Sequence, residues 1–279
     1  MAATHVFGGQ LACAEQFVSL LCSSGVTHGL IGPREVPRIW DRHVLNCAVV
    51  GSLLPAQGEV IDVGAGAGLP GLALAIARPD CRVHLVEPML RRTTWLQDAV
   101  ERLELPNALV HRGRAEELWD ALSAPVVTSR AVARLAQLSR WSLPLLRPHG
   151  QMLAIKGSSA RTELAEDAAE LRRLGAVATG VLEVGAPEVD PPTTVVRVRL
   201  GDRPAKRVGA KGPAVRRRTS AGTRDGRAKT APTSVGSASA GSSAAAGSSS
   251  ESENASRTRR GRSSDRRAPA QGTPRRRRG

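Results

Sequence analysis

Three glycines at alternate positions, Gly64, Gly66 and Gly68, stand between an apolar run and a helical stretch. Glycine has no side chain to hold a ligand away from the backbone, and it readily adopts positive φ. The apolar run at 59–64 is rich in β-branched residues, as a buried strand requires. Pro70 falls where the first turn of a helix tolerates proline. This strand, glycine turn and helix N-terminus favour a nucleotide site at the carboxyl edge of a parallel sheet.

Two acids decide which nucleotide we expect. Gly66 begins a G-x-G-x-x-G pattern, which dinucleotide sites share. Asp62 precedes the glycines, where it can orient the loop or meet the ammonium group of S-adenosylmethionine. Glu87 ends the next predicted strand, where an acid accepts hydrogen bonds from both ribose hydroxyls. The chain shows no second nucleotide half and no obvious hydride-transfer acid, so S-adenosylmethionine is the predicted cofactor.

Further candidates follow the third and fourth predicted strands. Ala115 and Glu116 come where an adenine would lie, although Glu116 and Glu117 can equally stabilise a helix N-terminus. Arg130 ends the fourth strand at the ligand edge, and the alternative is a solvent-facing ion pair. This edge carries neither the Asn/Asp-Pro-Pro-aromatic motif of amino-group methyltransferases nor the nucleophilic cysteine of cytosine-C5 enzymes.

The elements that must position these residues alternate regularly. Strands are expected at 59–64, 82–87, 107–112, 124–129, 150–156, 177–184 and 193–200. Helices are expected at 70–78, 89–104, 115–122, 132–147 and 160–175. This alternation predicts an α/β fold with a mostly parallel sheet, and the last two strands are close enough to form an antiparallel hairpin.

Three regions are predicted along the chain. Residues 1–58 form a helical N-terminal extension, with one helix around 11–25 and a second from about Pro37 to Leu54. Residues 59–202 form the cofactor-binding domain. Residues 203–279 are rich in Arg, Ser, Gly and Ala and have few apolar side chains, so this tail is predicted to be disordered.

Charge is divided unevenly between the body and the tail. The chain has 40 Lys and Arg residues and a formal net charge of +15, yet residues 1–202 are close to neutral. The excess lies in 203–279, which suggests a tail that adds affinity for RNA phosphate. A solvated extension with no selected role is the alternative. A body this neutral favours a monomer.

Composition limits the compartment and the metal chemistry. The four cysteines show no C-x-x-C spacing, so neither a zinc site nor a disulfide framework is expected, and no metal is predicted. We see no signal peptide and no apolar run of about 20 residues that could span a bilayer. A cytoplasmic protein without membrane contact is therefore expected.

In combination the motifs resemble one known family. The chain is similar to the small-subunit ribosomal RNA methyltransferase G family (RsmG, or GidB) from about residue 7 to residue 200. The motifs that carry the resemblance are Trp40-Asp41-Arg42-His43-x-x-Asn46, residues 61–71, Glu87-x-x-x-Arg91-Arg92, residues 112–117, Ser129-Arg130-Ala131 and Lys156-Gly157. The tail lies outside the family's pattern.

The resemblance implies a Rossmann-like class I S-adenosylmethionine-dependent methyltransferase fold. It implies methyl transfer to N7 of guanine-527 in 16S ribosomal RNA, with that RNA or the small ribosomal subunit as partner. Its cofactor contacts would be Gly64, Leu69, Glu87, Ala115, Glu116 and Arg130, and Arg42, His43 and Lys156 would face the RNA. His43 can equally be a packed helix histidine.

Guanine N7 carries an in-plane lone pair, so no proton need be removed before methyl transfer. We therefore expect Arg42, His43, Arg130 and Lys156 to position the substrate, without a dedicated base. Another methyltransferase with the same cofactor site, or a non-catalytic RNA-binding protein with a vestigial site, remain as alternatives.

Overall fold

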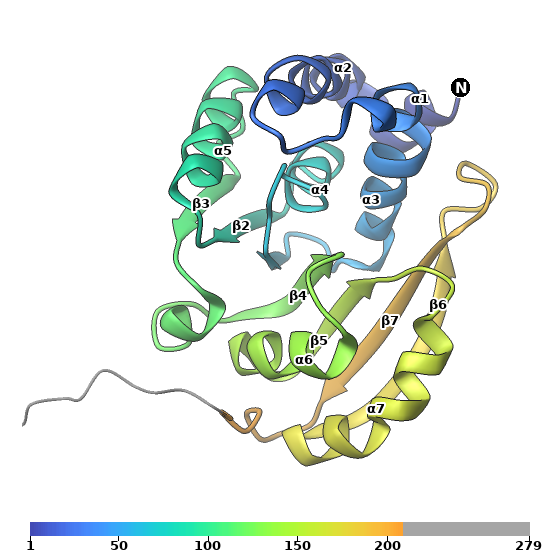
Figure 1. Ribbon diagram of the computed structural model, residues 1–279. Helices are drawn as coiled ribbons and strands as arrows, with labels where there is room; N and C mark the ends of the chain where they lie inside the picture. The colour runs from blue at the N-terminus through green and yellow to red at the C-terminus, as the bar shows by residue number, and fades with distance from the viewer. Residues whose placement is uncertain (209–279) are drawn as a thin grey trace, which may run out of the picture. The chain divides into compact units, whose positions relative to one another are not determined.

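A seven-stranded β-sheet organises residues 1–208, the part of the chain that this computed structural model describes. The strands lie in the order β3-β2-β1-β4-β5-β7-β6 (Figure 1). Their bounds are β1 (Glu59–Val63), β2 (Arg82–Glu87), β3 (Ala108–Arg112), β4 (Ala124–Arg130), β5 (Leu146–Ile155), β6 (Ala176–Val184) and β7 (Thr193–Leu200).

Strands β1 to β5 pair in parallel, whereas β7 runs antiparallel to both β5 and β6. The predicted fold class, with an antiparallel last strand, is confirmed. Val60 of β1 lies between Val83 of β2 and Val126 of β4, so the strand order reverses at β1. Such a reversal opens a crevice at the carboxyl ends of the strands, where α/β proteins bind their ligands.

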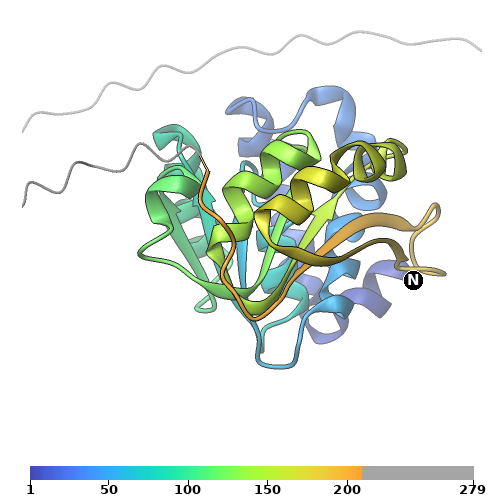
Figure 2. The same ribbon diagram turned by 90° about the horizontal axis from the view of Figure 1, so that it is seen from below.

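Helices cover the two faces of the sheet (Figures 1 and 2). The N-terminal helices, α4 and α5 pack on one face, and α6 and α7 pack on the other. The longer helices that follow the N-terminal region are α4 (Gly71–Ala77), α5 (Leu90–Arg102), α6 (Leu135–Ser142) and α7 (Ala160–Leu174). Within β1, Val60 packs into the first core and Ile61 into the second. Burial on both faces explains the unbroken apolar run of this strand.

The N-terminal extension is helical, as expected, but its winding changes pitch. The segments are α1 (Ala2–Phe7), η1 (Gly8–Gln10), α2 (Leu11–Leu20), η2 (Leu21–Gly25), η3 (Pro33–Arg38), η4 (Ile39–Leu45), α3 (Asn46–Ala48) and η5 (Val49–Leu53). The predicted helix from Pro37 to Leu54 is thus a succession of 3₁₀, π and α turns. Pro37 lies inside η3, where proline removes a backbone donor that a regular α-helix would use.

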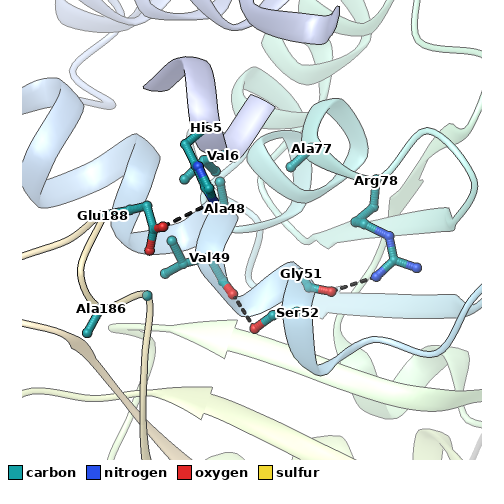
Figure 3. A pocket seen from close by; sticks show the side chains of 11 residues that line it. His5, Val6, Ala48, Val49, Gly51, Ser52, Ala77, Arg78, Ala186 and Glu188 are labelled. Atoms are coloured by element: carbon teal, nitrogen blue, oxygen red, sulfur yellow. Dashed lines mark hydrogen bonds and ion pairs between the residues drawn. The ribbon is translucent and has the colours of Figure 1, made fainter. Parts of the chain in front are cut away.

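Arg78 fastens the end of this extension to the sheet domain. All five N–H donors of its guanidinium are bonded: to the carbonyl oxygens of Gly51, Leu54 and Pro55 and to both carboxylate oxygens of Asp80. Figure 3 shows the bond to Gly51. The extension is therefore held in place before it reaches β1.

Two predicted helices differ from the observed ones. The helix expected at 115–122 is a single short turn, η6 (Ala115–Leu118). The helix expected at 132–147 begins only at Leu135 and gives way to η7 (Leu143–Leu145) and β5. Its first residues instead continue the β4–α6 loop, which Ala131 enters with a φ of 55° that no helix accommodates. That loop lies at the ligand edge of the sheet.

The packed body continues past the predicted domain end at 202. Ala205 is buried, and the amide of Lys206 donates to the carbonyl oxygen of Leu174. Arg207 pairs with Asp120 at 2.7 Å and lies over the ring of Trp119. The rest of the predicted disordered tail, residues 209–279, lies outside the described residues. No helix among residues 1–208 is long and apolar enough to cross a membrane.

Candidate functional site

The glycine turn leaves β1 with an unusual backbone. Gly64, Gly66 and Gly68 have φ angles of 76°, 54° and 78°, in the left-handed region that disfavours other residues. A Cβ on Gly68 would approach the Leu72 side chain to 2.4 Å, whereas one on Gly66 would meet only the Gly64 carbonyl, at 3.7 Å. Gly68 thus allows the loop to pack on α4, and Gly66 leaves bare backbone facing open space.

Asp62 supports this turn from below. It is fully buried, and its Oδ2 accepts a hydrogen bond of 2.8 Å from the amide of Gly71. Its other oxygen has no partner among the described residues. Burial raises the pKa of Asp62 to about 7, and the negative charge of Glu87 acts in the same direction. Of the two roles expected for Asp62, the structure realises orientation of the glycine loop.

Glu87 ends β2 with a side chain that is only 2% exposed. Its Oε2 accepts from the amide of Gly66 at 3.1 Å and its Oε1 from that of Met89 at 3.0 Å. Arg92 approaches Oε2 to 3.6 Å. The carboxylate is therefore fixed beside the bare loop, where an acid can accept hydrogen bonds from the hydroxyls of a ribose.

These groups line a pocket of about 450 Å³ at the carboxyl ends of β1, β2 and β4. Of the predicted cofactor residues, Gly64, Gly66, Leu69, Glu87 and Arg130 line it, while Asp62 and Gly68 lie behind its wall. His43 also lines it, contributed by the N-terminal extension. Wall residues that no sequence motif had marked include Leu30 and Ile31 of the N-terminal extension and Met89 after β2.

A smaller apolar pocket of about 180 Å³ adjoins the first and shares Gly64, Pro88 and Val132 with it. Ala115 and Glu116, predicted to lie near an adenine, line this pocket, and so does Trp141, which the sequence analysis had not assigned. The alternative role, support of a helix N-terminus, falls to Glu117, whose carboxylate accepts from the amide of Arg114 at 2.9 Å.

The two pockets together fit an adenosine cofactor. Backbone without side chains lies beside a fixed acid, and a largely apolar recess suited to a planar base opens next to them. Substitution of Gly64 would close this space, because a Cβ there would approach Val132 to 2.6 Å. The orphaned, buried Oδ1 of Asp62 leaves one acceptor directly behind the loop.

A third pocket of about 540 Å³ lies on the other side of Arg130. Three of the predicted substrate-positioning residues, Arg42, Arg130 and Lys156, meet in its wall. Asn46, Arg134, Ser159 and Glu163 also line it. Unlike the cofactor pocket, it is walled largely by charged and polar side chains. We call it the acceptor pocket.

Lys156 is more enclosed than an RNA-facing lysine would be. Its side chain is 10% exposed, and Nζ donates to the carbonyl oxygen of Ala133 at 2.7 Å and to Glu163 at 2.8 Å. Burial raises the pKa of Glu163, but hydrogen bonds from Lys156, Ser159 and the amide of Leu135 outweigh burial, and the pKa falls below its ordinary value. This pair fastens the α6 end of the β4–α6 loop, through Ala133 and Leu135, and leaves one N–H of Lys156 for a ligand.

Arg130 separates the two larger pockets and lines both. The guanidinium makes no ion pair with a carboxylate among residues 1–208, so the solvent-facing ion pair considered from sequence is not found. It donates instead to His43 and Cys47. Its position at the end of β4 is the ligand-edge position expected for it.

A separate pocket of about 390 Å³ lies at the far end of α4 from the glycine turn (Figure 3). Its polar groups are already engaged: His5 faces Glu188 at 3.1 Å, and Arg78 is saturated by the contacts described above. No predicted site residue lines it. Within residues 1–208 no group of three His, Cys, Asp or Glu residues is placed to hold a metal ion.

Comparisons with known proteins agree with this geometry. The family model described as rRNA small subunit methyltransferase G matches residues 10–189. A ribosomal RNA small subunit methyltransferase G from Rhodococcus jostii is 56% identical over 199 residues, which cover 70% of this chain and 87% of the relative. One from Streptomyces avermitilis is 53% identical over 203 residues, covering 72% and 85%. Among solved structures, the S-adenosylmethionine-dependent methyltransferase SibL is similar over 60% of this chain and 57% of its own, at 16% identity and a TM-score of 0.48.

Proposed function

The chain belongs to the rRNA small subunit methyltransferase G family, and from that premise we propose that it methylates N7 of a guanine in 16S ribosomal RNA. The methyl donor is S-adenosylmethionine. The observation that carries the proposal is the pair of adjoining sites: bare positive-φ backbone beside Glu87 on one side of Arg130, and a charged pocket on the other.

On the cofactor side, Glu87 binds the ribose hydroxyls, and the main chain at Gly64 and Gly66 accommodates the methionine portion. The recess lined by Ala115, Glu116 and Trp141 takes the adenine. When bound, S-adenosylmethionine supplies an electrophilic methyl group on a sulfonium ion. Burial of Glu87 strengthens its hydrogen bonds, because the surroundings screen charge less than water does.

On the acceptor side, the task is alignment. The target nucleotide is held through its phosphate or its O6 edge by Arg42, Arg130 and the remaining donor of Lys156. Arginine and lysine donate hydrogen bonds to phosphate oxygens and to guanine O6. Holding two reactants in line contributes up to about 7–11 kcal/mol in favourable systems. The guanine lone pair needs no base, so the proposal assigns none to this pocket.

A transfer assay tests this function. The full chain is incubated with methyl-labelled S-adenosylmethionine and, separately, with free small subunits, mature ribosomes and naked small-subunit RNA. We expect label in the RNA of at least one substrate, at a guanine that becomes sensitive to chemical cleavage specific for N7 methylation. Cofactor binding without transfer to any of the three would point to another methyltransferase substrate. Absence of cofactor binding would indicate a non-catalytic RNA-binding protein.

We propose that the protein acts as a monomer in the cytoplasm, without membrane contact. The location of ribosomal RNA supports the proposed compartment. Light scattering of the purified full chain would give the mass directly, and a dimer mass at micromolar concentration would contradict the proposed monomer.

A further inference from the structure

His43 connects two charged residues and is largely shielded from solvent. Its side chain is 12% exposed, with Nε2 at 2.8 Å from a carboxylate oxygen of Glu35 and Nδ1 at 2.6 Å from Arg130. A guanidinium can only donate hydrogen bonds, so Nδ1 must accept from Arg130. The ring proton therefore resides on Nε2 and is donated to Glu35. Both ring nitrogens are occupied, which leaves neither for RNA.

Both terminal nitrogens of the Arg130 guanidinium donate hydrogen bonds. Besides its bond to Nδ1 of His43, it donates from the other terminal nitrogen to the His43 carbonyl oxygen at 3.3 Å and to Cys47 Sγ at 3.1 Å. Three of its five donors are thus used. The Nε–H and one terminal N–H have no partner among residues 1–208, and this residue lines the cofactor pocket. Two such donors can bind a carboxylate together.

We propose that Glu35 is a positioning residue: by fixing the tautomer of His43, it aims the two free donors of Arg130 at the carboxylate of the bound cofactor. This rests on the proposed function, since it takes the pocket of Gly64, Gly66 and Glu87 as the cofactor site. Glu35 lies on η3, well separated in sequence from β4, and His43 on η4 joins the two. The N-terminal extension thereby takes part in cofactor binding.

Glu35 is better placed for His43 than for its other neighbour. Its carboxylate is 3.7 Å from the exposed Arg42, against 2.8 Å from the imidazole. The hydrogen bond to His43 is the main cause of the lowered pKa of Glu35, so the carboxylate remains ionised at neutral pH. It is therefore available as an acceptor throughout the range in which the protein works.

The arrangement requires a neutral imidazole. Burial lowers the pKa of His43, the positive charges of Arg130 and Arg42 act in the same direction, and Glu35 opposes them. Protonation at low pH places a hydrogen on Nδ1, facing the Arg130 donor, and the contact is lost. Removal of the Glu35 charge lowers the pKa of His43 further. The pH below which Arg130 is released should then also fall.

The test is calorimetric titration of the full chain with S-adenosylhomocysteine, which carries the same carboxylate, in the absence of RNA and from pH 5 to 8. Glu35→Ala should weaken binding about tenfold at pH 8. Glu35→Gln keeps an acceptor for Nε2–H and should bind within about twofold of wild type at pH 8. Its loss of affinity on acidification should occur at lower pH than in the wild type. Asp41→Asn, at an exposed acid on η4 without an ion pair among residues 1–208, is the matched control and should change neither property.

Unchanged affinity in Glu35→Ala, or an acid limb in Glu35→Gln that coincides with wild type, would overturn the inference. If Glu35→Ala does not fold, the position of the Glu35→Gln limb decides alone, because a purely structural role would not move it. The proposed function is judged separately by transfer to RNA in the wild type. A wild type that binds S-adenosylhomocysteine but methylates no ribosomal RNA would refute that function and leave the role of Glu35 measurable.

Discussion

The two pockets on either side of Arg130 are built from different materials. The cofactor pocket has backbone at its centre: the glycine turn forms part of its wall, and even Glu87 is held there by main-chain amides. The acceptor pocket is largely side chain, with Arg42 from the N-terminal extension and Lys156 from the end of β5. Where backbone lines a pocket, a larger residue should block the ligand. Where side chains line it, truncation of a side chain should remove contacts with the ligand. This difference determines what each substitution should do.

The largest effect should come from adding a side chain to the backbone wall. Gly66→Val should weaken binding of S-adenosylmethionine by about 100-fold or more, because valine disfavours the φ of 54° and projects into the ligand's space. Methyl transfer should be lost with it. Calorimetric titration measures the affinity.

Gly8→Val is the matched control for this prediction. Gly8 has a φ of 50°, and an added Cβ there meets nothing within 4 Å, but it lies in the N-terminal extension away from the pocket. Gly8→Val therefore also places valine at a positive φ, but away from the ligand. If both variants lost affinity equally, strain in the fold would explain the loss and the backbone cradle would be refuted.

Removal of the shared wall should come next. Arg130→Ala should reduce methyl transfer by about 100-fold or more while the protein stays folded, since two charge-assisted hydrogen bonds to ligand are lost. Arg161→Ala removes an exposed guanidinium from α7 that lies 3.8 Å from Glu183 and lines neither pocket, and it should change the rate severalfold at most. Near-normal transfer by Arg130→Ala would reject its place at the reaction.

A smaller effect should come from Asp62, the buried acid behind the glycine turn, whose ionisation should lower the free energy of unfolding. The pKa of Asp62 rises from 3.8 to about 7 on folding, so the folded protein holds this proton where the unfolded chain has lost it. The contribution of Asp62 to stability should therefore fall as pH rises from about 4 to 7 and stay level above that, by at most about 4 kcal/mol.

Asp62→Asn isolates this contribution, because its amide oxygen still accepts from Gly71 but does not titrate. In urea unfolding at pH 5 and pH 8, the wild type should lose stability relative to the variant as the pH rises. Equal differences in the two proteins would mean that Asp62 is ionised at pH 5 in the folded state.

The smallest effect should be confined to RNA binding. A chain ending at Val208 lacks most of the basic tail but keeps the packing of Ala205 and Arg207. Its affinity for S-adenosylmethionine should be unchanged. Its RNA affinity should depend less steeply on salt, by a slope of about 0.7–0.9 for each phosphate contact removed. An identical slope would favour the tail as a solvated extension.

The contrast between pockets also explains what the sequence could predict. The glycine turn and Glu87 depend on spacing along adjacent β–α units, so a local pattern discloses them. Ala115 and Glu116 follow from their place after the third predicted strand, whereas the role of Arg42 came from resemblance to a family. Trp141, Leu30 and Glu35 reach the site only because α6 and the N-terminal extension fold against the sheet. No period or motif marks them, and they require the three-dimensional structure.

The lysine at the end of β5 illustrates the same limit. The family resemblance implies that Lys156 faces the RNA, and in the structure Lys156 lines the acceptor pocket. However, its ammonium is committed mainly to Glu163 and Ala133, partners that lie on separate elements. Position along a strand indicates which edge of the sheet a side chain reaches, but not which neighbouring groups accept its hydrogen bonds.

Arg130, Ala131 and Val132 belong to both larger pockets. A ligand that fixes this stretch from one pocket also fixes part of the wall of the other pocket. The two binding equilibria can therefore be coupled. By thermodynamic reciprocity, if bound RNA changes the dissociation constant of S-adenosylmethionine by some factor, bound S-adenosylmethionine changes the dissociation constant of RNA by the same factor. The methyl donor and its demethylated product can thus differ in their effect on the affinity of the enzyme for RNA.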